Sequence, residues 1–123
     1  GFLLGACLVS LIVAATPQTS ATAGSVNATP VVHMGVSTFS QPTVTISKGA
    51  KLQLVDDGQF PHVLSNGVWS NGTAQQVTEP GAPSIQNLNV NGNSLEIGPF
   101  NTSGTFHIYC TIHPGMNLVV IVQ

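Results

Sequence analysis

The sequence predicts an all-β protein, a Greek-key β-sandwich of about eight strands formed by residues 31–123. Short apolar runs follow one another along this region, and several of them alternate apolar and polar residues with a period of two. The 13 glycines and 8 prolines fall between the runs as turn signals. Because no helical period and no internal repeat interrupts this pattern, one small sandwich domain accounts for it.

Seven apolar runs are the main expected strands: 31–36, 43–47, 51–56, 85–90, 94–98, 104–110 and 117–122. The third run is typical, since Leu52 and Leu54 alternate with Lys51 and Gln53. This pattern predicts a strand with one face in the core and the other toward water.

Turn signals divide the middle of the chain. Asn66-Gly67 and Asn71-Gly72 stand on either side of residues 68–70, and both dipeptides favour tight turns. Residues 73–84 carry prolines and polar residues without a period, so we expect an irregular crossing there.

The first 30 residues read as two segments that precede the domain. Residues 1–15 are apolar and uncharged, with the length of a signal-peptide core, and missing upstream residues could extend them into a membrane anchor. Cys7 lies in a stretch that resembles a lipobox, so lipidation is a third outcome. Residues 16–30 are rich in Ala, Thr and Ser and predict a flexible linker. An exported protein, periplasmic or at the cell surface, is expected in each case.

Charge and cysteine content argue against a nucleic-acid-binding protein and against a disulfide. Only 5% of the residues are charged, and the formal net charge is -2 without a basic cluster, which argues against nucleic-acid binding. The two cysteines, Cys7 and Cys110, lie in the leader and in a candidate metal loop, so we do not expect them to pair.

The candidate metal loop lies near the C-terminus. Two residues separate Cys110 from His113 and two more separate His113 from Met116, and Pro114-Gly115 can turn all three side chains toward one point. A thiolate, an imidazole and a thioether are a soft donor set that prefers copper and needs one more imidazole. His62 is the candidate for that fourth ligand.

Other readings of these residues are weaker. A structural zinc site would contain more thiolates or imidazoles and no thioether. A nucleophilic Cys–His pair would need a third group to orient it, and none accompanies Cys110 and His113. Each residue alone could also be an ordinary core or surface residue, but their joint spacing argues for a metal site.

At these residues the sequence resembles the cupredoxins, the small blue-copper proteins typified by plastocyanin and amicyanin, over residues 31–123. The segment 60–62 looks like the first ligand loop of that family, and 109–116 looks like its C-terminal ligand loop in the short, amicyanin-like form. Many plastocyanins have Asn directly after the first ligand, whereas this chain has Val63, which leaves open how the two loops are joined. The resemblance implies one copper ion per chain, bound by His62, Cys110, His113 and axial Met116.

A cupredoxin of this kind implies a monomeric one-electron carrier, not an enzyme, that passes electrons between protein partners. The resemblance places docking at an apolar patch near His113, lined by Phe60, Pro61, Pro114, Gly115 and Phe100. Two alternatives remain open: a copper carrier or metallochaperone that transfers the ion itself, and a metal-free adhesion module on the same fold.

Four further side chains are expected to have ordinary surroundings. His33 has no ligand-like spacing, and His107 should point to solvent because it lies on the opposite strand face from Cys110. Trp69 is expected in the core or at its rim. Tyr109 should face outward, where the family uses a tyrosine as a second route for electrons.

Overall fold

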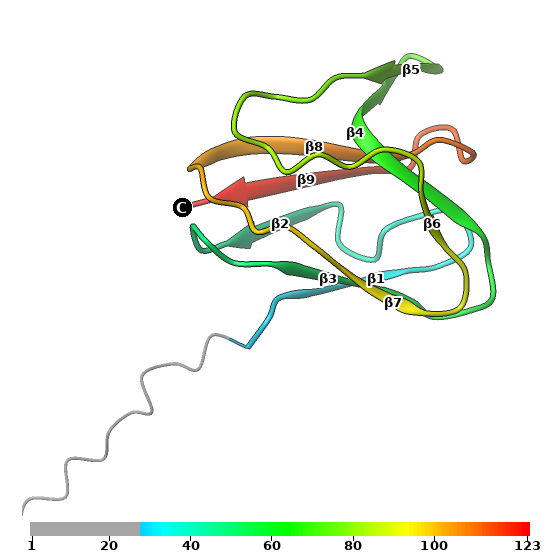
Figure 1. The fold of residues 1–123 in the computed structure, drawn as a ribbon. Coiled ribbons are helices and arrows are strands. Elements are labelled where there is room, and N and C mark those ends of the chain that lie inside the picture. Colours follow the sequence, from blue (N-terminus) through cyan, green and yellow to red (C-terminus); the bar gives the residue numbers. More distant parts are fainter. Residues whose placement is uncertain (1–27) are drawn as a thin grey trace, which may run out of the picture.

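The structure of the protein is a computed structural model that describes residues 28–123. These residues form nine strands stacked in two layers (Figure 1). The strands are β1 (Val31–Met34), β2 (Thr43–Ile46), β3 (Leu52–Asp56), β4 (His62–Ser70), β5 (Thr73–Gln76), β6 (Leu88–Val90), β7 (Ser94–Ile97), β8 (Gly104–Cys110) and β9 (Asn117–Val122). The all-β sandwich predicted from the sequence is therefore confirmed.

The two sheets differ in size. One has three strands in the order β1-β3-β7, and the other has the order β2-β9-β8-β4-β5, with β6 pairing β4 as a branch. Strands β1 and β2 follow each other in the chain but join different sheets, each by parallel pairing, to β3 and β9 respectively. The chain therefore closes the sandwich by crossing between layers rather than by hairpins alone.

The predicted leader at 1–15 and most of the predicted linker at 16–30 lie outside the described residues. In the part of the chain that the structure describes, no helix is long and apolar enough to cross a membrane.

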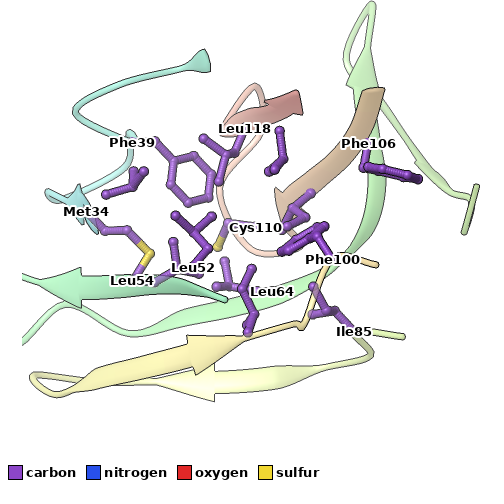
Figure 2. Packing of buried hydrophobic residues seen from close by; sticks show 14 of the residues in the cluster. Met34, Phe39, Leu52, Leu54, Leu64, Ile85, Phe100, Phe106, Cys110 and Leu118 are labelled. Carbon is purple, nitrogen blue, oxygen red and sulfur yellow. The ribbon is translucent and has the colours of Figure 1, made fainter. Parts of the chain in front are cut away.

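The core consists of the apolar side chains that the strands turn inward. Strand β9 shows the pattern, since Leu118, Val120 and Val122 are buried while the residues between them are half-buried. Figure 2 shows Cys110 surrounded by core side chains such as Leu118 and Leu64. The thiol of the candidate metal loop is thus placed by the same packing that holds the two sheets together.

Strand β4 passes without a break through Asn66-Gly67, a dipeptide that was wrongly predicted as a turn. The Asn66 side chain is buried and binds the crossing segment on both sides: its Nδ2 donates to Pro83 O at 3.1 Å, and its Oδ1 accepts from Ile85 N at 2.6 Å. An amide that is satisfied by a distant segment has no reason to form a local turn.

Gly67 has a different role from the one that a turn would give it. Its φ is +133°, and a Cβ there would lie 2.0 Å from Gln75 O and 2.9 Å from the Tyr109 ring. The absent side chain lets β5 and Tyr109 approach the strand closely. The real hairpin turn is Asn71-Gly72, with φ values of 50° and 76°, and it leads into β5, an exposed edge strand in the region expected to be irregular.

Candidate metal centre

The candidate metal loop joins β8 to β9 and is closed by its own backbone. The amide of Cys110 donates to Met116 O at 3.0 Å, and the amide of Met116 donates to His113 O at 3.1 Å. Gly115 supplies the left-handed conformation of the turn, with φ of +82°. The loop lies at the end of the sandwich opposite the C-terminus (Figure 1). The backbone hydrogen bonds thus hold Cys110, His113 and Met116 close together in one short loop.

His62 reaches the same place from the start of β4, which pairs with β8. Two backbone contacts of Val63 join its strand to the loop: the amide of Thr111 donates to Val63 O at 2.7 Å, and the amide of Val63 donates to Cys110 Sγ at 3.5 Å. The backbone at position 63 therefore joins the two ligand segments, so an Asn side chain is not needed there for that purpose.

Three of the four predicted ligands converge on one point. The Cys110 Sγ lies 3.3 Å from His113 Nδ1 and 3.8 Å from His62 Nδ1, and one ligand atom from each residue lies within 4.8 Å of the others. Cys110 and His62 are buried, whereas His113 is half-buried. Met116, the fourth predicted ligand, is 1% exposed and is tied by its backbone to both Cys110 and His113.

The orientation of the His62 ring is fixed from behind. Its Nε2 lies 2.9 Å from Gly35 O, and because a carbonyl oxygen only accepts, Nε2 carries the proton. The unprotonated Nδ1 then faces Cys110. Burial lowers the pKa of His62, although the hydrogen bond to Gly35 and the carboxylate of Asp56 act in the opposite direction. Burial thus favours the neutral imidazole, the form that a metal ion needs.

This donor set fits copper. A thiol between two imidazole Nδ1 atoms, with a buried thioether residue on the same loop, is the soft combination that copper prefers. The Val63 amide that points at Sγ suits a thiolate, because a hydrogen bond to the charged form favours it. Ligation of the metal by all four residues remains a prediction.

Two residues that support the loop could not be identified from the sequence. The Trp69 indole donates from Nε1 to Cys110 O at 2.7 Å. The side chain of Asn117 binds the Trp69 backbone twice, accepting from Trp69 N at 2.8 Å and donating to Trp69 O at 3.0 Å. Both partners of Trp69 are more than 40 residues away, so no local pattern signals the contact.

Tyr109 lies outside the core cluster, as an outward-facing residue should, but it is not exposed. It is 4% exposed and packs edge-on against Trp69, with ring centroids 6.0 Å apart. Alternation along β8 places Tyr109 on the opposite face from Ile108 and Cys110, outside the core cluster. Its burial comes from the side chains on that outer face, where the Trp69 ring of the neighbouring strand β4 packs against it. Phe100 is also buried, at 1%, so it cannot line a surface patch as expected.

The remaining two histidines pair with acids outside the candidate site. His33 is about half exposed, and its Nδ1 lies 2.6 Å from Asp57 Oδ1. His107 lies on the outer side as predicted but is only 37% exposed at its side chain, with Nδ1 2.6 Å from Glu79 Oε1. Neither belongs to the cluster around Cys110.

A buried thiol between two imidazoles, at one end of a two-sheet sandwich, defines a small β-protein with a metal centre. The sequence profile of the copper binding proteins, plastocyanin/azurin family, matches residues 27–123. Since this covers most of the chain, the protein belongs to that family, and its cofactor is copper. The resemblance to the cupredoxins is confirmed.

Solved structures of other proteins share the fold of this chain. Amicyanin from Paracoccus versutus is 23% identical, with a TM-score of 0.58 over 76% of this chain and 80% of that one. A purple cupredoxin from Nitrosopumilus maritimus is 20% identical, with a TM-score of 0.56 over 76% of this chain and 99% of that one. At these identities the likeness establishes the fold. A search of curated proteins found no match.

Proposed function

We propose that His62, Cys110, His113 and Met116 bind one copper ion, and that the protein carries single electrons between protein partners outside the cytoplasm. One observation carries the proposal: the thiol of Cys110 lies between two imidazole Nδ1 atoms, at 3.3 and 3.8 Å. The family supports copper as the metal. A bound copper ion would supply a centre that alternates between Cu(I) and Cu(II).

The residues around this centre suit electron transfer better than turnover. Cys110, His62 and Met116 are buried, and the backbone bonds of Val63 and Thr111 hold the two ligand segments together. Four protein ligands leave no position for a substrate, so we assign no enzymatic activity. A centre that changes little in shape between its two states needs little reorganisation, and restraints of this kind favour that behaviour.

The docking surface follows from the exposed residues beside the ligands, which we call the loop patch. It consists of the exposed residues next to His62 and His113 in the chain, without the buried Phe100. Its members are Phe60, Pro61, Ile112, Pro114 and Gly115. Phe60 and Ile112 are 40% and 48% exposed. We propose that redox partners dock on this patch, in a small and short-lived contact.

Charge supports an apolar contact rather than an electrostatic one. Of the four acids in the chain, Asp56 is buried, and Asp57 and Glu79 each lie beside a histidine. These acids do not form an exposed acidic cluster for a basic partner to recognise. We therefore expect association rates that depend weakly on salt.

The test is the optical spectrum of the protein after stoichiometric Cu(II) is added. We expect an intense visible band from thiolate-to-copper charge transfer and one copper per chain. Cys110→Ser should abolish the band, whereas Met116→Gln should retain copper as the matched control. A folded wild-type protein that stays colourless would contradict the proposal. Copper that a chelator removes faster than electrons exchange would favour a copper carrier instead.

A further inference from the structure

A buried carboxylate lies behind the His62 ring, on the side away from Cys110. The Asp56 Oδ1 is 3.9 Å from His62 Nε2, and neither side chain has exposed surface. The proton on Nε2 is donated to Gly35 O at 2.9 Å, so the N–H edge of the imidazole faces two oxygens at once. Asp56 is not one of the predicted ligands, and the sequence marks it only as the last residue of the expected strand 51–56.

The position of this carboxylate is fixed by the backbone. Its Oδ2 accepts from Gly92 N at 2.8 Å, and its Oδ1 accepts from Gly58 N at 3.3 Å. The amide of Asp56 also donates to Asn93 O at 3.2 Å. Because an ionised carboxylate only accepts, two N–H donors suit its charged form. The end of β3, the turn after it and the β6–β7 turn thus place one negative charge beside His62.

A negative charge in this position should interact strongly with a metal ion bound at His62. Water screens exposed charges, but a charge with no exposed surface interacts through a medium of lower dielectric constant. The oxidised centre carries one more positive charge than the reduced centre, so a fixed negative charge nearby stabilises the oxidised centre more. Buried carboxylates behind a metal-binding histidine also orient the ring and raise its basicity.

We propose that Asp56 is a positioning residue for the copper centre, which orients His62 through its N–H edge and lowers the reduction potential by stabilising Cu(II) over Cu(I). This inference rests on the proposed copper site. It names a residue that contacts a ligand without binding the metal itself. Reduction takes one electron from the electrode, and no proton transfer is required.

The experiment compares Asp56→Asn with Asp57→Asn. The two substitutions remove the same charge from adjacent residues, but the Asp57 side chain is 56% exposed whereas that of Asp56 has no exposed surface. Voltammetry of the copper-loaded proteins should show a higher potential for Asp56→Asn. We expect the Cu(I):Cu(II) ratio at fixed electrode potential to rise about tenfold, which is about 59 mV for one electron. Asp57→Asn should change it less than about twofold because solvent screens its charge.

Two independent readings sharpen the result. Competition titrations should show that Asp56→Asn weakens Cu(II) binding more than Cu(I) binding, as the same thermodynamic cycle requires. In the copper-free protein, ¹⁵N NMR should find wild-type His62 protonated at Nε2, and Asp56→Asn should raise the share of the Nδ1–H tautomer. The NMR reading needs no metal, so it tests the positioning role even if the wild-type protein proves colourless with Cu(II).

Three outcomes would overturn the inference. The first is an unchanged potential in Asp56→Asn. The second is an equal shift in both variants, which would reduce the effect to net charge. The third is a wild-type copper-free protein in which His62 is protonated at Nδ1, and this result decides the question even if Asp56→Asn does not fold.

Discussion

The two histidines of the candidate site occupy opposite environments. His62 is 1% exposed, begins a nine-residue strand and is held from behind by Gly35 and Asp56. His113 lies on a short loop, is half-buried and has exposed residues on both sides in the chain. Their rings nevertheless come together, with centroids 5.1 Å apart.

This difference separates two tasks. The His62 side depends on contacts between distant parts of the chain, since Gly35 is 27 residues away and Cys110 is 48 residues away. The His113 side depends on a loop whose closing hydrogen bonds span only a few residues. We infer that the sandwich holds the buried His62 side of the site in place, while the loop forms the His113 side that a partner can approach.

The largest expected contrast comes from deleting each imidazole. His113→Gly should open the site toward solvent, so added imidazole can enter and restore the visible band with Cu(II). His62→Gly should leave an enclosed gap and an unpaired Gly35 carbonyl, which costs about 1–3 kcal/mol of stability. Imidazole should not restore the band in that variant. Optical titration of both variants with Cu(II) and imidazole checks this.

Circular dichroism of both variants is the control, because an unfolded His62→Gly would give the same colourless result for another reason. Equal rescue of both variants would show that the two sides are equally accessible. That result would contradict the inference that the His62 side is enclosed and the His113 side open.

A smaller effect is expected at the loop patch. Ile112→Lys should slow electron self-exchange between two copies of the protein by about tenfold, or about 1.4 kcal/mol, because a hydrated charge must be brought into the contact. NMR line broadening in mixtures of the reduced and oxidised protein measures this rate. The variant should also make the rate depend on salt, which we do not expect of the wild type.

Val77→Lys is the matched control, since Val77 is 53% exposed and lies outside the loop patch. Equal slowing in both variants would indicate a general charge effect. No slowing in either variant would mean that electrons leave by another surface.

The smallest expected effect is the pH dependence of the copper-free protein. Burial lowers the pKa of His62 from its ordinary 6.5, so below that pH the unfolded chain takes up a proton that the folded protein does not. The free energy of unfolding should therefore fall as the pH falls below 6.5, by at most about 1.4 kcal/mol per pH unit from this group. Urea titrations at several pH values, with His62→Gln as the control, measure its share. If the free energy of unfolding changes equally with pH in the two proteins, His62 is not the group responsible.

The sequence by itself determined the class of fold and the candidate ligands. Alternating runs such as 117–122 specify which residues face the core, because side chains on a strand alternate between its two faces. The spacing of Cys110, His113 and Met116 is a local property, since one short loop holds all three. The prediction that His62 completes the set depended on the resemblance of its short segment to the cupredoxins, and the structure brings it to Cys110.

The tertiary structure decided what surrounds those ligands. Asn66 reads as a turn residue, yet its amide is satisfied by Pro83 and Ile85 in a separate segment. Tyr109 reads as exposed on the outer face of its strand, yet the Trp69 ring packs against it and it is buried. Asp56 behind His62 and Trp69 on the Cys110 carbonyl are contacts across 6 and 41 residues that no spacing rule predicts. Burial and hydrogen-bond partners depend on which strands pair and which faces are covered, and these are properties of the folded chain rather than of any single stretch of it.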